Sequence, residues 1–422
     1  MFWLLSLILW LLVGIMGIAL LAFIILAYFI WLQPIFSFPK PTGPFAVGMR
    51  EYHWIDRERS EVIKVCAHPN RELIVRLWYP AQGEVPLKPS WPWSVHFVTY
   101  LKKKHRFVWL QLFSRPLRSY TQFNISLSSE EKHFPVIIFS HGFGCTHDFN
   151  TAHCEELASH GYVVVAINHT YCSTFSQFPD GRIVGLGPIQ KMAEEAGDFK
   201  KFLDQQVEVW IADVQFVLDQ IERISTDRDS IFYQWLDLSN VGMFGHSMGG
   251  ATAVHICCRE PRIKAVVNLD GSLSSERLKI SQNKPYMFIF GGNACDLYER
   301  LWTEAERKQL GLKSVEEEQK EKAFYFAVKR TLLVDFAHAY KFVIKGAGHA
   351  DFCDRGLFKS ATLFSLFFMK DKLGTQLGSI DGFRATEIVN AYLVNFFDKY
   401  LKGKPSALLD GNEKVYAEIE KR

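Results

Sequence analysis

Six short apolar segments recur along the chain, and stretches with helical periodicity separate them. The predicted strands are residues 136–139, 162–167, 241–244, 265–269, 286–290 and 341–344. The clearest predicted helices are residues 152–160, 205–224, 247–259 and 385–401. Continuous apolar strands that alternate with helices are typical of a parallel sheet covered on both faces. The sequence therefore predicts an α/β fold with a mostly parallel central sheet.

Smaller features complete the expected organisation of the body, residues 46–405. Apolar and polar residues alternate in 62–66 and 73–79 around Pro69-Asn70, which predicts a β-hairpin at the sheet edge. Residues 298–335 are expected to form a helical insert, and residues 406–422 a polar tail.

The N-terminal segment carries no Asp, Glu, Lys or Arg before Lys40. As a helix, residues 1–32 would be about 48 Å long, more than the roughly 30 Å of a hydrocarbon core. We expect one transmembrane anchor at 1–32, followed by a linker at 33–45. A cleaved signal peptide is the alternative, although the segment has no basic start. Basic residues after the span weakly favour a cytoplasmic body, and the side of the membrane stays open.

The composition excludes two classes of protein. The 422 residues include 48 Lys+Arg and 45 Asp+Glu, and this near balance argues against nucleic-acid binding. With 14% aromatic residues, the chain has ample apolar area for a folded core, which excludes an intrinsically disordered protein. Eight scattered cysteines show neither a disulfide framework nor zinc-ligand spacing, so buried thiols are expected and the disulfide state stays open.

The most informative motif is Gly245-x-Ser247-x-Gly249, which lies between a predicted strand and a predicted helix. Small residues two positions before and after the serine allow the sharp turn of a nucleophile elbow. The pattern therefore predicts Ser247 as a nucleophile at the start of the helix.

A base for this serine must come from far away in the sequence. His349 follows the last predicted strand within G-A-G-H-A-D, and α/β folds place reactive groups at this edge of the sheet. We interpret His141, His169, His246 and His255 as structural. No spacing of ligands suggests a metal, and no cofactor is expected.

Two aspartates could orient the imidazole. Asp270 ends the strand at 265–269, and Asp296 follows the next strand. From pattern alone, either carboxylate could serve, and either could instead cap a helix or a loop.

An oxyanion hole needs backbone N–H groups aimed at the developing negative charge. The glycine-rich segment F-S-H-G-F-G at 139–144 follows a predicted strand and allows close approach. The N–H groups of Phe143 and Met248 are the expected donors.

Several segments resemble the calcium-independent platelet-activating factor acetylhydrolases of the plasma and intracellular type II kind. They are P-K-P-T-G-P-F-A-V-G at 39–48, L-W-Y-P at 77–80, F-S-H-G-F-G at 139–144, L-A-S-H-G-Y-V-V at 157–164, G-H-S-M-G-G-A-T at 245–252 and N-L-D-G at 268–271. The family takes its acid 23 residues after the serine, and 270 − 247 = 23, which favours Asp270. Met248 departs from the family, where an aromatic residue often follows the serine.

The resemblance implies an α/β-hydrolase that removes short or oxidised sn-2 acyl chains from phospholipids such as 1-alkyl-2-acetylglycerophosphocholine, without a metal ion. The implied partners are the phospholipid and the bilayer, with no nucleic acid and no obligate protein partner. A broad carboxylesterase, lipase or polyester-type hydrolase is the alternative within enzymes. A non-catalytic, membrane-anchored binding protein is the alternative outside them.

Two further segments suggest contacts with lipid. Residues 91–118 interleave aromatic and basic side chains, a mixture that suits either a bilayer surface or an insertion packed on the core. Phe324 and Phe326 in the helical insert could line an acyl pocket or pack in the core.

Overall fold

The computed structural model describes most of the chain in two compact units. The described residues are 2–32, 37–63, 68–83, 88–89, 118–197, 199–273, 284–310, 312–328, 339–360, 377–411 and 415–422. One unit comprises residues 1–38 and 87–119, and the other residues 39–86 and 120–422. The larger unit contains all the motifs that carry chemistry.

The smaller unit contains a long apolar helix, α1 (Phe2–Leu32). Its stretch Ser6–Tyr28 has a mean hydropathy of 2.9 and is long enough to cross a membrane, a property that signal sequences share. A short antiparallel pair, β3 (Lys88–Pro89) and β4 (Arg118–Ser119), belongs to the same unit. Apart from Arg118, the expected lipid-facing segment 91–118 lies outside the described residues.

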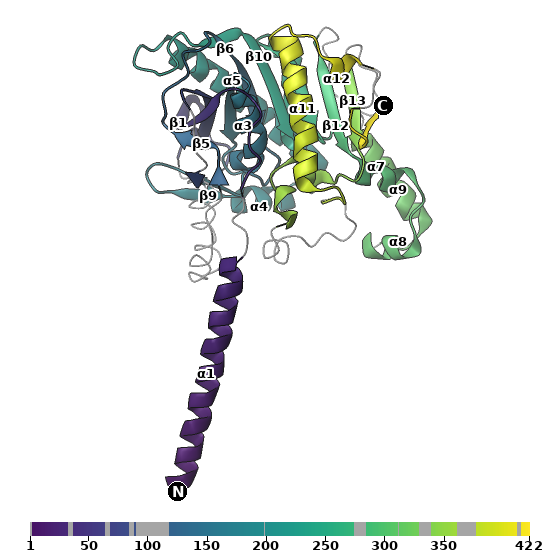
Figure 1. Cartoon of the computed structure of the whole chain (residues 1–422). Coiled ribbons are helices and arrows are strands. Elements are labelled where there is room, and N and C mark those ends of the chain that lie inside the picture. The colour runs from purple at the N-terminus through teal and green to yellow at the C-terminus, as the bar shows by residue number, and fades with distance from the viewer. Residues whose placement is uncertain are drawn as a thin grey trace. The chain divides into compact units, whose positions relative to one another are not determined.

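The larger unit is built on a ten-stranded sheet with the order β14-β13-β12-β11-β10-β6-β7-β2-β1-β5 (Figure 1). The strands are β1 (Ala46–Ser60), β2 (Asn70–Ala81), β5 (Thr121–Phe123), β6 (Phe134–Ser140), β7 (Val163–Asn168), β10 (Leu236–His246), β11 (Ile263–Leu269), β12 (Tyr286–Gly291), β13 (Ala339–Ile344) and β14 (Ile419–Lys421). The six central strands from β13 to β7 run parallel, which confirms the predicted α/β fold.

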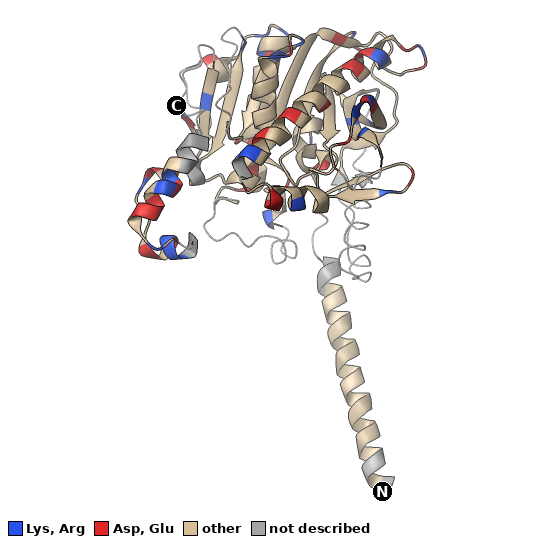
Figure 2. Ribbon diagram, turned by 180° about the vertical axis from the view of Figure 1, so that it is seen from behind, with Lys and Arg blue, Asp and Glu red and all other residues tan. Residues whose placement is uncertain are grey.

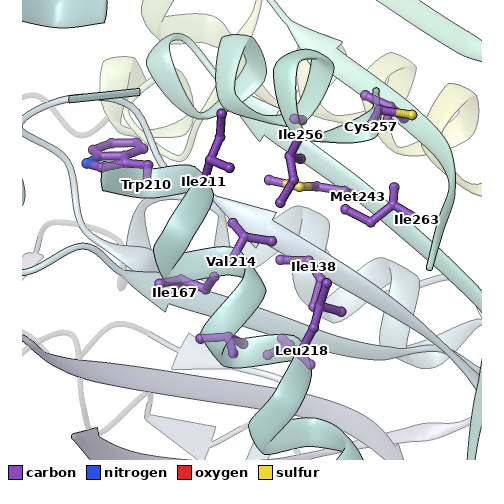
Figure 3. Packing of buried hydrophobic residues seen from close by; sticks show 14 of the residues in the cluster. Ile138, Ile167, Trp210, Ile211, Val214, Leu218, Met243, Ile256, Cys257 and Ile263 are labelled. Carbon is purple, nitrogen blue, oxygen red and sulfur yellow. The ribbon is translucent and has the colours of Figure 1, made fainter. Parts of the chain in front are cut away.

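Helices cover both faces of this sheet and bury two hydrophobic clusters. They include α3 (Thr151–Ser159), α4 (Gly187–Glu195), α5 (Phe199–Thr226), α6 (Met248–Cys257) and α11 (Gly382–Leu401). On one face, α5 and α6 pack against the sheet through residues such as Val214, Ile256 and Met243 (Figure 3). On the other face, α3 and α11 pack through Leu157 and Phe396. Both faces of the central strands are therefore dry, which explains their continuous apolar runs.

The insert predicted at 298–335 is helical in its described part. It follows α7 (Gly292–Glu299) and contains α8 (Glu304–Leu310) and α9 (Val315–Val328), whose charged residues are visible in Figure 2. Glu318 is buried and forms ion pairs with Arg307 and Lys322. The side chains of Phe324 and Phe326 lie outside the described part.

Both ends of the sheet differ from the expected organisation. The hairpin partner of β2 is β1, not residues 62–66, because the long strand 46–60 pairs with β2 from Ala46 to Asp56 and again at Ser60, after an irregularity. In the segment 62–66 that was predicted to pair with β2, residues 64–66 lie outside the described part and Val62 is exposed. Residues 406–422, expected as a polar tail, contain α12 (Ala407–Asp410) and β14, which pairs antiparallel with β13.

A buried ion pair joins the β1–β2 end of the sheet to α5. Arg71 donates to Asp213 through Nε (3.0 Å) and Nη2 (2.7 Å), and Arg59 Nη2 lies 2.9 Å from the same carboxylate. Burial alone would raise the pKa of the Asp213 carboxyl, but the Arg71 charge and the hydrogen bonds outweigh it and hold this pKa far below its usual range. Asp213 is therefore ionised at neutral pH.

We predict that Asp213→Asn lowers the free energy of unfolding by roughly 3 kcal/mol, because it removes one of the two carboxylates, Asp213 and Glu61, that pair with the buried Arg71. A carboxyl whose pKa is depressed by folding contributes stability above its unfolded pKa of about 4, and this contribution is lost as the pH falls further. The difference between wild type and variant should thus narrow below about pH 4. Urea unfolding followed by tryptophan fluorescence at several pH values measures it, and a pH-independent difference would contradict this account.

Candidate active site

Ser247 occupies a sharp turn between β10 and α6. Its φ of 55° and ψ of −122° are unusual for a residue with a side chain, as a nucleophile elbow requires. A Cβ on Gly245 would lie 2.2 Å from the Gly249 carbonyl carbon, and one on Gly249 would lie 2.0 Å from the Ser140 carbonyl oxygen. Only glycine fits at these two positions, so the motif is explained by close packing of helix on strand.

Asp270 and His349 meet at the carboxyl end of the parallel strands. The His349 Nδ1 and Asp270 Oδ2 atoms are 2.6 Å apart. The Asp270 backbone N–H donates to the Ile289 carbonyl, and its Oδ1 accepts from the Gly291 N–H at 3.2 Å. A carboxylate on Nδ1 favours the tautomer that carries its proton there, which leaves Nε2 available as a base.

Asp296, the alternative acid, has a different environment from Asp270. It belongs to α7, its side chain is exposed, and it makes no contact with His349 among the described residues. Of the two aspartates that the sequence left open, the structure brings only Asp270 to the imidazole.

Two further side chains, Asp351 and His246, hold the loop that carries His349, and of these two the sequence pattern did not point to Asp351. Asp351 Oδ2 accepts from the backbone N–H groups of Gly348 (2.8 Å) and Gly378 (2.6 Å). His246, predicted to be structural, contacts the His349 carbonyl oxygen through Nε2 at 2.9 Å. The residue before Ser247 thus tethers the His349 backbone to the elbow.

Asn268 shapes the turn that presents Asp270. Its Oδ1 accepts from the Gly271 N–H at 2.6 Å, and its Nδ2 donates to the Gly271 carbonyl at 3.2 Å. Asp270 has a positive φ of 51° within this turn. The Asn268 side chain therefore explains the N-L-D-G segment, because it holds the turn that carries Asp270. The sequence signal for this residue is an Asn close to the acid.

The Ser247 hydroxyl makes no hydrogen bond to His349 in the part of the chain that the structure describes. Such bonds are often long in ligand-free enzymes and tighten with substrate. Both side chains are partly exposed, whereas Asp270 is buried, so solvent reaches the serine and the imidazole but not the acid.

The predicted oxyanion segment lies directly beside the elbow. A Cβ on Gly142 would lie 3.2 Å from Ser247 Cβ, which places the glycine loop against the serine. Met248 follows the serine as the first residue of α6, where helix N–H groups have no partner within the helix. Within the described residues, the N–H groups of Phe143 and Met248 have no backbone acceptor outside helices and strands.

The described residues contain no group of three or more His, Cys, Asp or Glu side chains that could hold a metal ion. The seven described cysteines are free thiols. The arrangement offers a hydroxyl, an imidazole oriented by a carboxylate, and free N–H groups on one edge of the sheet. Together these groups can perform acyl transfer through a serine.

Comparison with known proteins agrees with this chemistry. A family model described as "Platelet-activating factor acetylhydrolase, isoform II" matches residues 32–413. The chain belongs to this family. It is therefore a carboxylic ester hydrolase of lipid metabolism.

Individual relatives share low sequence identity with this chain, but the matches cover most of its length. The platelet-activating factor acetylhydrolase of Cavia porcellus is 25% identical over 389 residues, which cover 86% of this chain and 78% of the relative. The probable 1-alkyl-2-acetylglycerophosphocholine esterase of Arthroderma benhamiae is 23% identical, over 68% of this chain and 65% of the relative. The solved ferulic acid esterase of Streptomyces cinnamoneus is 26% identical with a TM-score of 0.68, and the match covers 92% of this chain and 99% of that one. The fold is thus that of an α/β-hydrolase.

We predict that Asp270→Asn lowers kcat by about 10⁴, because the amide favours the wrong imidazole tautomer. The matched variant Asp296→Asn should leave kcat within about threefold, since the Asp296 side chain is exposed and does not contact His349 among the described residues. Steady-state hydrolysis of an aryl ester by both variants measures the contrast. A larger loss in Asp296→Asn would reassign the acid.

Proposed function

We propose that this chain is a serine esterase that hydrolyses short or oxidised sn-2 acyl esters of phospholipids, of the 1-alkyl-2-acetylglycerophosphocholine type. The observation that carries the proposal is the 2.6 Å contact between Asp270 and His349 at the edge where the Ser247 elbow ends β10. Membership of the acetylhydrolase family supports the substrate class.

In the acylation step, the Ser247 oxygen attacks the sn-2 ester carbonyl while His349 Nε2 takes the hydroxyl proton. The carbonyl oxygen becomes an oxyanion, which the N–H groups of Phe143 and Met248 stabilise. Asp270 stabilises the imidazolium through Nδ1. His349 then returns the proton to the lyso-phospholipid alcohol, which leaves the acyl group on Ser247.

In the deacylation step, His349 activates a water that attacks the acyl-enzyme by the same route. The free fatty acid leaves and Ser247 regains its proton. Every proton transfer in this cycle uses residues of the chain itself, so we propose that the reaction runs without a metal or cofactor.

A broad carboxylesterase is the second candidate, because the similar solved structure is described as a ferulic acid esterase. The two functions share the serine chemistry and differ in the acyl and alcohol groups that the pocket accepts. The chain-length profile on phospholipids separates them, with simple aryl and feruloyl esters as comparison substrates.

We predict that the purified protein hydrolyses 1-alkyl-2-acetylglycerophosphocholine faster than a phosphatidylcholine with a long sn-2 chain. Ser247→Ala or His349→Ala should lower kcat by about 10³ or more without loss of folding. Labelling by an organophosphate should require Ser247. Labelling that persists in Ser247→Ala would refute the nucleophile, and activity confined to aryl or feruloyl esters would favour the broad esterase. An inactive wild type would favour a non-catalytic binding protein.

We further propose that α1 remains in the mature protein as a single membrane anchor. Its 31 residues contain no charged side chain, and its apolar stretch Ser6–Tyr28 of 23 residues is longer than the roughly 7–15 apolar residues of a typical signal peptide. A retained anchor would keep the esterase close to its lipid substrate.

We predict that the full chain stays in the membrane pellet after alkaline carbonate extraction, whereas a variant without residues 1–32 becomes extractable. The intact mass of the expressed protein distinguishes a retained anchor from a cleaved signal peptide. A mature chain that lacks this segment would show that it is a cleaved signal.

A further inference from the structure

A second Ser–His–Asp array lies outside the candidate active site. Ser140 Oγ is 2.9 Å from His169 Nε2, and His169 Nδ1 is 2.8 Å from Asp213 Oδ2. The order of contacts copies that of a catalytic triad. However, Ser140, His169 and Asp213 are 0% exposed, so no substrate can reach them. The role of the array must therefore lie in its contacts with neighbouring residues of the protein.

His169 is held rigidly within this array. Its ring stacks on Trp210 with centroids 3.9 Å apart and planes 5° from parallel. Asp213, which accepts from its Nδ1, is itself fixed by the two guanidinium groups of Arg71 and Arg59. Burial outweighs the neighbouring carboxylate and lowers the pKa of His169, which favours a neutral ring that accepts from the Ser140 hydroxyl.

His141 connects this rigid array to the loop beside Ser247. The His169 backbone N–H donates to His141 Nε2 at 3.1 Å, so that nitrogen carries no proton. The proton must lie on Nδ1, which is 2.7 Å from the Gly142 carbonyl oxygen and donates to it. Burial, with the nearby His169, holds the pKa of His141 well below its usual range and keeps the ring in this neutral form.

The Gly142 carbonyl belongs to the same peptide group as the Phe143 N–H. The Cys145 N–H also donates to this carbonyl, at 2.9 Å, so two donors fix its direction. The described chain contains no cis peptide bond, and in a trans peptide the C=O and N–H point in opposite directions. Fixing the Gly142 oxygen therefore fixes where the Phe143 N–H points.

We infer that His141 is a positioning residue of the oxyanion hole, which orients the Phe143 N–H by holding the Gly142 carbonyl, with the sealed Asp213–His169–Ser140 array as its anchor. The inference rests on the proposed function, in which Phe143 is an oxyanion donor. The inference gives the histidine of the F-S-H-G-F-G segment a role in addition to the turn that its glycines allow.

Two variants of matched polarity test the role of His141 in the full chain. In His141→Asn the amide nitrogen can occupy the place of Nδ1 and still donate to Gly142. In His141→Gln the amide lies near the place of Nε2, so the donor to Gly142 is lost. We expect His141→Gln to lower kcat by about 10- to 100-fold with little change in KM, and His141→Asn to stay within about fivefold of wild type.

Inhibition by an alkyl trifluoromethyl ketone gives a readout that a merely structural role would not change. Addition of Ser247 to this ketone creates an oxyanion, so its Ki should rise in His141→Gln by the factor that kcat/KM loses. The pH profile of kcat/KM should keep its shape, because His349 is untouched. Urea unfolding controls for the folded fraction of each variant.

Equal losses in both histidine variants, or wild-type kcat per folded molecule in His141→Gln, would overturn the inference. If neither variant folds, Ser140→Ala removes only one hydroxyl from the array and should weaken kcat and ketone binding together by about fivefold. Unchanged values there would also overturn it. Activity that persists in Ser247→Ala would instead refute the proposed function, so the two failures are distinguishable.

Discussion

The close contact of α6 with the ends of β6 and β10 is the constraint on which the rest of the site depends. Gly249 lies so near the Ser140 carbonyl that a single methyl group would overlap it. This contact forces the chain into the positive φ of Ser247 and points the start of the helix at the sheet edge. It also places the 140–145 loop beside the serine, so the same packing contact brings together the proposed nucleophile and the proposed oxyanion donors.

Parallel topology then supplies the remaining groups. The strands β10, β11 and β13 end on the same edge of the sheet, and Ser247, Asp270 and His349 each follow one of these ends. Local hydrogen bonds refine their positions. Asn268 shapes the turn of Asp270, and Asp351 and His246 hold the His349 backbone. The three side chains proposed to act on the substrate are therefore held in place by hydrogen bonds from their neighbours.

The core next to the glycine-rich loop contains a buried polar array. Asp213, His169 and Ser140 form this array together with Arg71. Breaking one contact of such a network leaves a partner unpaired in a low-dielectric interior, which is costly. A network of this kind resists small displacements, which an apolar cluster would tolerate.

The sequence by itself determined the strand order along the chain, the elbow at Ser247 and the base candidate His349, because apolar periodicity and glycine spacing are local properties. It left Asp270 and Asp296 open on pattern, since both follow strands, and only the tertiary structure showed that Asp296 faces solvent while Asp270 contacts the imidazole. The β1 ladder, the edge strand β14 and the array beneath His141 were likewise decided by the fold. Phe342 pairs with Lys421 of β14, and 421 − 342 = 79 residues separate them in the chain. Local sequence carries no record of such distant pairings.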